Sequence, residues 1–159
     1  MGAADQHVFD ALRARHYPPG RNRLRAHITL FHQLPPSCLG ELDRLLKAIA
    51  AGAPPPAAIG GVISLDRGVA YRVDSPALLA IREAIADWFA GSLSAQDRGV
   101  PRLHITVQNK VASAAARALL AELRRDFRAR PLAIAGLAAH YYRGGPWETV
   151  ATRNFRGRS

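Results

Sequence analysis

The feature that most constrains this chain is a four-residue pattern that occurs twice. His27-Ile28-Thr29-Leu30 recurs, almost unchanged, as His104-Ile105-Thr106-Val107. Successive side chains of a strand point to opposite faces. Each copy therefore predicts a half-buried strand, with its histidine and threonine on one face and its apolar residues on the other. Two such copies in a chain of 159 residues indicate a duplicated unit that contributes one histidine per copy.

The elements around the motifs predict an α+β fold. Apolar periodicity and turn residues indicate helices at 5–16, 39–50, from 76 onward and at 113–128, and strands at 26–31, 57–66, 69–73, 102–108, 131–142 and 147–155. Because similar elements surround both motifs, we expect a bilobal fold with lobes at about 1–66 and 69–155. Two antiparallel sheets backed by helices would then enclose a central cleft with pseudo-twofold symmetry. The second lobe opens with a strand that the first lacks, so we expect that the first strand of lobe 1 has been lost or lies upstream.

Composition indicates a globular protein of a reducing compartment. Apolar residues make up 48% of the chain and charged residues 21%. No apolar run approaches the roughly 20 residues that a membrane span requires, and the N-terminal residues have no signal-peptide pattern. The single cysteine, Cys38, allows no intrachain disulfide. We expect a cytoplasmic monomer without membrane contacts.

The charge balance favours an anionic partner. The formal net charge is +10, and nearly all of the positive charge is arginine. Such a chain attracts nucleic acid through long-range electrostatics. The alternative is that biased codon usage has enriched arginine, in which case the charge says nothing about a partner. The charge is thus consistent with a phosphate-bearing substrate without establishing one.

The two polar faces together offer two imidazoles and two hydroxyls. If a pseudo-twofold axis brings them together across the cleft, His27 and His104 can act as general base and general acid, because imidazole gains and loses protons near neutral pH. The hydroxyls of Thr29 and Thr106 can bind the non-bridging oxygens of a phosphodiester. No cysteine or carboxylate cluster stands near either motif, so we expect no metal and no cofactor.

These motifs give the chain a recognisable relationship. With two His-x-Thr patterns 77 residues apart (104 − 27), the chain resembles the two-histidine (2H) phosphoesterase superfamily, in particular its bacterial 2′-5′ RNA ligase-like, or RNA 2′,3′-cyclic phosphodiesterase, group. The resemblance covers nearly the whole chain. It implies that His27 and His104 are catalytic, with the first usually assigned as acid and the second as base, and that Thr29 and Thr106 bind phosphate.

The residues after the motifs depart from the family pattern. Many relatives carry an arginine shortly after each motif, whereas this chain has Phe31-His32-Gln33 and Gln108-Asn109-Lys110. The candidate substrate contacts are Phe31, His32, Gln108, Lys110, Tyr142 and Arg143. For Phe31, His32, Tyr142 and Arg143 the alternative is an ordinary packing, turn or surface position.

The function that the resemblance implies is a hydrolase that opens 2′,3′-cyclic phosphate ends of RNA or nucleotides. Two alternatives remain open. One is a phosphodiesterase or ligase acting on 2′-5′ linkages in RNA, which would use the same residues. The other is a non-catalytic RNA-binding module with the same cleft, although a cleft that only binds has no need of both imidazoles.

Overall fold

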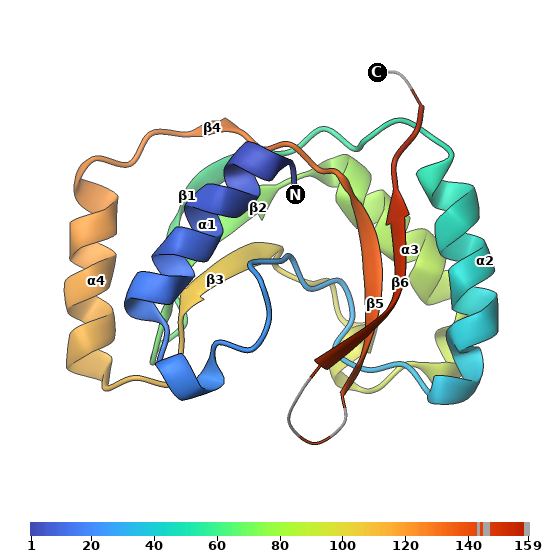
Figure 1. Cartoon of the computed structure of the whole chain (residues 1–159), viewed down its shortest axis with the longest axis horizontal. Coiled ribbons are helices and arrows are strands. Elements are labelled where there is room, and N and C mark those ends of the chain that lie inside the picture. The colour runs from blue at the N-terminus through green and yellow to red at the C-terminus, as the bar shows by residue number, and fades with distance from the viewer. Residues whose placement is uncertain (143, 145–146, 158–159) are drawn as a thin grey trace. The chain divides into compact units, whose positions relative to one another are not determined.

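The computed structural model describes residues 1–142, 144 and 147–157. Over these residues the chain forms the predicted α+β fold, with four α-helices and two antiparallel sheets (Figure 1). The helices are α1 (Ala3–His16), α2 (Leu39–Ala50), α3 (Pro76–Trp88) and α4 (Ser113–Arg125). The strands are β1 (Ala58–Ser64), β2 (Val69–Asp74), β3 (His104–Gln108), β4 (Arg130–Pro131), β5 (Gly136–Tyr142) and β6 (Trp147–Asn154). No helix in the described part of the chain is long and apolar enough to span a membrane.

The chain divides into two compact units, each assembled from three separate segments. The first unit comprises Met1–Thr29, Ala57–Asp74 and Arg102–Ala133, and the second comprises Leu30–Pro56, Ser75–Pro101 and Ile134–Ser159. This division crosses the continuous lobes predicted at about 1–66 and 69–155. As a result both His-x-Thr motifs belong to the first unit, rather than one to each lobe.

A four-stranded sheet forms the centre of the first unit. Its strand order is β3-β2-β1-β4, and each neighbouring pair is antiparallel. α1 packs against β3, and α4 packs against β1 and β2. Phe9 of α1 meets Tyr71 of β2 edge to face, with ring centroids 5.3 Å apart, and Phe127 lies 6.2 Å from Tyr71. Tyr71 therefore joins α1 and the segment after α4 to the sheet that carries the second motif.

The second unit consists of the β5–β6 hairpin with α2 and α3. α2 packs against this hairpin, and an ion pair 2.5 Å long joins Asp43 of α2 to Arg153 of β6. α3 begins where the sequence predicts, because the Ser75 hydroxyl oxygen accepts a hydrogen bond of 3.0 Å from the Leu78 amide.

The prediction of a continuous strand at 26–31 is wrong. Only Ile28 pairs with a neighbouring strand, as an isolated bridge. The reason is that side chains of α1 take the backbone groups that a ladder would use. Asp10 accepts a hydrogen bond of 2.7 Å from the Ala26 amide, and Gln6 donates one of 2.9 Å to the Ala26 carbonyl.

The strand predicted at 131–142 is also divided in the structure. Its first residue belongs to β4, which pairs with β1 in the first unit, and its second half is β5, which pairs with β6 in the second. The intervening residues include Leu132 and Ile134, which are buried apolar side chains outside any strand. Apolar content alone made this segment resemble one long strand.

Candidate active site

The two motifs lie side by side in the first unit. Ile28 and Ile105 form an antiparallel bridge. Extending that register by one residue in each direction sets His27 opposite Thr106 and Thr29 opposite His104. Opposed residues of an antiparallel pair have Cα atoms about 4.5–5.5 Å apart and share a face, and diagonal neighbours such as the two histidines are about 7–8 Å apart. Continued in this register, the four polar side chains would lie around the bridge.

Burial distinguishes the two faces of the second motif. Ile105 and Val107 are fully buried, with no exposed surface, and Leu103 is 3% exposed. The side chains that alternate with them, His104 and Thr106, are partly exposed. The core therefore takes the apolar face of the second motif and leaves the polar face accessible to a ligand. In the first motif His27 is exposed, whereas Thr29 and the predicted core residues Ile28 and Leu30 are all partly exposed, so burial does not separate two faces there.

The two histidine rings are held in the same way. Nδ1 of His27 lies 2.7 Å from the carbonyl oxygen of Arg25, and Nδ1 of His104 lies 2.6 Å from that of Arg102. A carbonyl can only accept a hydrogen bond, so Nδ1 donates its proton in both rings. That arrangement makes Nε2 the nitrogen of each ring that takes up or releases a proton.

Helix α1 fixes the geometry of both motifs from outside the sheet. Its Asp10 and Gln6 hold the backbone of Ala26, one residue before His27. Its Arg13 donates a hydrogen bond of 2.8 Å to the carbonyl oxygen of Thr106. One helix thus positions the first motif through the amide and carbonyl groups of Ala26, and the second through a buried guanidinium.

Two of the predicted substrate contacts lie in the first unit and differ in their exposure to solvent. Gln108, at the end of β3, is 7% exposed, and its Oε1 has no hydrogen-bond partner among the described residues. Lys110 is exposed, with a φ of 58° that few side chains other than Gly or Asn adopt, and its amide donates to the side chain of Asn109. The register of β2 and β3 shifts between Thr106 and Gln108, so the alternation that exposes His104 and Thr106 is broken there and Gln108 is buried rather than on their face, which corrects the prediction. Lys110 lies beyond the strand.

The remaining predicted contacts belong to the second unit. Phe31 lies under the guanidinium of Arg82, 4.8 Å from ring centroid to Cζ. His32 is bound to Asp97, and Tyr142 is exposed and packs on Trp147 with centroids 4.9 Å apart. Arg143 lies outside the described residues. These contacts with substrate stay predictions.

Asp97 is an important residue that the sequence did not reveal. Its side chain is 2% exposed, and it accepts hydrogen bonds of 2.9 and 3.0 Å from the consecutive amides of His32 and Gln33. It also accepts one of 3.0 Å from Nδ1 of His32 and one of 3.0 Å from the hydroxyl of Ser94. Asp97 therefore anchors the segment that directly follows the first motif. The one sequence signal was an aspartate three residues after Ser94 in a loop, a spacing that side-chain to backbone turns often use.

The chemistry available to the paired motifs is acid–base chemistry. Two imidazoles with defined Nε2 atoms and two hydroxyls share one accessible face, which suits proton transfer together with the binding of an anion. Within the residues that the structure describes, no three histidine, cysteine, aspartate or glutamate side chains gather into a group that could hold a metal ion.

Comparison with known proteins gives a family and a fold. A family model described as the 2′-5′ RNA ligase superfamily matches residues 2–146. Among solved structures, the crystal structure of TT0787 of Thermus thermophilus is similar, with a TM-score of 0.58 and 16% sequence identity, covering 100% of this chain and 96% of that chain. At this identity the likeness concerns the fold. No curated protein matches the chain by sequence.

Proposed function

Because the chain belongs to the 2′-5′ RNA ligase superfamily, we propose that it is a metal-independent phosphodiesterase that opens the 2′,3′-cyclic phosphate ends of RNA or nucleotides. His27 and His104 are its acid and base, and Thr29 and Thr106 bind the reacting phosphate. The observation that carries the proposal is the matched pair of Nδ1 hydrogen bonds to the Arg25 and Arg102 carbonyls. We expect the protein to work as a cytoplasmic monomer.

The reaction needs one ring in each protonation state. The neutral ring of His104, with its Nδ1 proton held by Arg102, accepts a proton at Nε2 from the attacking water. As the water oxygen bonds to phosphorus, the bond from phosphorus to the ribose 3′ oxygen breaks. That oxygen takes a proton from Nε2 of His27, and the product carries a 2′-phosphate. Exchange of protons with solvent restores both rings.

The threonines stabilise the negative charge that develops on the phosphate. In the antiparallel register each hydroxyl stands opposite a histidine of the other motif. A non-bridging oxygen that gains negative charge as the water adds can therefore accept a hydrogen bond from Thr29 or Thr106. The arrangement also explains why each motif contributes both residue types.

The test is turnover of an RNA that ends in a 2′,3′-cyclic phosphate, in the presence of EDTA, with the product identified by phosphorus NMR. We expect conversion to a 2′-phosphate. Turnover only of 2′-5′-linked dinucleotides would favour the alternative activity. Binding of RNA without turnover of either substrate would favour the non-catalytic module. Activity that appears only after divalent metal is added would contradict metal independence.

A further inference from the structure

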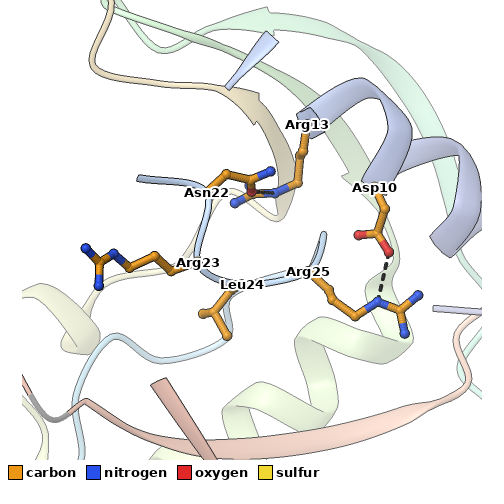
Figure 2. Close-up of a pocket in the computed structure, with 6 residues that line it drawn as sticks. All are labelled: Asp10, Arg13, Asn22, Arg23, Leu24 and Arg25. Carbon is orange, nitrogen blue, oxygen red and sulfur yellow. Dashed lines mark hydrogen bonds and ion pairs between the residues drawn. The ribbon is translucent and has the colours of Figure 1, made fainter. Parts of the chain in front are cut away.

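We propose that a cavity beside the first motif is a second anion site, which binds a phosphate group of the substrate other than the one that reacts. The cavity lies within the first unit, has a volume of about 250 Å³ and is lined by Asp10, Arg13, Asn22, Arg23, Leu24 and Arg25 (Figure 2). The inference rests on the proposed function and adds a specificity: substrates with a phosphate on the 5′ side of the reacting nucleotide are preferred.

The lining of this cavity carries an excess of positive charge. Three arginines and one aspartate are among the residues that line it, which is a formal excess of two positive charges. The carboxylate of Asp10 is already engaged. One of its oxygens accepts from the Ala26 amide at 2.7 Å and from Gln6 at 3.0 Å, and the other accepts from Arg25 at 2.8 Å. Asp10 therefore offsets one of the three positive charges, through its ion pair with Arg25, and the excess of two remains.

Arg13 is a buried cation without an acidic partner in the part of the chain that the structure describes. It is 4% exposed, and no carboxylate among the described residues forms an ion pair with it. Its guanidinium donates to Asn22 at 3.1 Å and to the Thr106 carbonyl at 2.8 Å, and it stacks 4.3 Å from the centroid of the Tyr17 ring. Burial lowers the pKa of Arg13, and nearby Tyr17 and Asp10 only partly oppose this. A buried charge that lacks a counter-ion gains when an anion arrives.

The other two arginines leave their guanidinium groups accessible. Arg23 is exposed, and its Nε donates a long hydrogen bond of 3.3 Å to the Gly20 carbonyl. The Arg25 side chain is 76% exposed while it pairs with Asp10. Figure 2 shows Arg23 and Arg25 extending from the same loop that carries Asn22 and Leu24. A phosphate can therefore approach from solvent and meet Arg13 at the inner wall.

The cavity is tied to the reacting groups through its own walls. The Arg25 carbonyl holds the His27 ring, and Arg13 holds the backbone of Thr106. Arg25 precedes His27 by two residues, which is at most about 7 Å of extended chain. An anion bound here is thus close enough to belong to the same substrate molecule as the phosphate between the motifs.

The test compares three cyclic phosphate substrates: a 2′,3′-cyclic mononucleotide with a free 5′ hydroxyl, the same compound with a 5′-phosphate, and a dinucleotide with a cyclic end. We expect kcat/KM to be roughly fivefold higher for the two substrates that carry the extra phosphate. A factor of this size corresponds to the stabilisation that one solvent-accessible ion pair contributes. A preference shared by both identifies a 5′-phosphate in either setting as the ligand. A preference for the dinucleotide alone identifies the phosphodiester of an RNA strand.

Variants of the arginines then test whether the preference for the extra phosphate comes from this cavity. Arg23→Gln, alone and with Arg25→Gln, should reduce it to near unity, whereas Arg117→Gln, which removes an exposed arginine of α4 outside the cavity, should leave it in place. A preference that persists in the double variant would overturn the anion site while leaving the proposed function intact.

A binding measurement separates failure of the site from failure of the proposed function. If no substrate is turned over, the affinity of a short single-stranded RNA is measured against salt concentration. Loss of a phosphate contact should make the salt slope shallower by about 0.7 for each arginine removed. An unchanged slope for both Arg23→Gln and the double variant would refute the anion site whether or not the protein is an enzyme.

Discussion

Replacing Asp97 by asparagine should destabilise the protein strongly, although the two side chains have nearly the same shape. One carboxylate oxygen accepts from the His32 amide and ring, and the other accepts from the Gln33 amide and the Ser94 hydroxyl. Every neighbour named here is a donor toward Asp97. Whichever way an asparagine is oriented, its amino group meets a backbone N–H donor at a site where the side chain is 2% exposed.

The magnitude follows from the hydrogen bonds that are lost. A hydrogen bond to a charged group contributes about 1.5–3 kcal/mol, and an unsatisfied buried donor costs about 1–3 kcal/mol. Asp97→Asn loses the charge from four bonds and leaves at least one amide without an acceptor, so we expect a loss of about 3–5 kcal/mol, the range for breaking a buried charged pair. Total stabilities are only about 5–15 kcal/mol, so the variant should unfold at markedly lower denaturant concentration.

The assay is urea unfolding of the Asp97→Asn variant beside Asp87→Asn, a matched change at an exposed aspartate of α3. The control should stay within about 0.5 kcal/mol of the unmodified protein, as surface substitutions usually do. If Asp97→Asn unfolds together with the control, the carboxylate does not anchor the segment after the first motif, and the reasoning is refuted.

The contribution of Asp97 should also depend on pH. Burial by itself raises the pKa of this carboxyl, but the hydrogen bonds from His32, Gln33 and Ser94 outweigh it and hold the pKa below the ordinary value of 3.8. A depressed pKa in the folded state gives stability that is complete above about pH 4 and is lost as the pH falls through the lowered value. The difference between the unmodified protein and Asp97→Asn should therefore shrink on acidification below about pH 4.

Two further predictions concern the motifs themselves. Thr29→Val and Thr106→Val, which keep the side-chain shape, should each lower kcat/KM by about 10- to 100-fold, since each removes a donor to the developing charge; thermal unfolding would show whether the fold is kept, and unchanged kinetics would remove the threonines from the site. Ile105→Ala, at a fully buried position bridged to Ile28, should cost about 3–4 kcal/mol in urea unfolding; a cost below about 1 kcal/mol would mean that this bridge is not tightly packed.

Local patterns predicted most of the elements correctly. The apolar spacing of Leu42, Leu45, Leu46 and Ile49 predicted a helix at 39–50, and α2 has those bounds. The alternation in residues 104–107 predicted that Ile105 and Val107 are buried, and they are, whereas Gln108, predicted on the polar face, is buried as well. In both cases one face of the element packs against the core, and the spacing of apolar residues in the sequence reflects that directly.

The strand prediction that failed and the residue that was missed both involve contacts between residues distant in the sequence. The segment 26–31 has the composition of a strand, but Asp10 and Gln6 of α1 take the backbone groups of Ala26. Nothing in the sequence of this segment indicates that side chains of α1 form these hydrogen bonds in place of a neighbouring strand. Asp97 acts on residues 64 and 65 positions earlier, at Gln33 and His32, and such a contact leaves no periodic signal.

The sequence predicted the members of the candidate site, but it did not predict how the two motifs come together. The repeated motif identified His27, Thr29, His104 and Thr106 as one set. The expectation of one motif in each lobe followed from chain order, whereas compact units form from whichever segments pack together, and here three segments supply the first unit. The bridge between Ile28 and Ile105 brings the motifs together directly.

The central claim is that both histidines exchange protons with a phosphodiester. Its most direct test is turnover of a 2′,3′-cyclic nucleotide in EDTA by the unmodified protein, His27→Ala, His104→Ala and the double variant. General acid–base catalysis predicts a loss of about 10²- to 10⁴-fold in kcat for each single variant. Because the two rings act as a unit, the double variant should lose little more activity than the less active single variant. Single variants that remain as active as the unmodified protein would contradict the account.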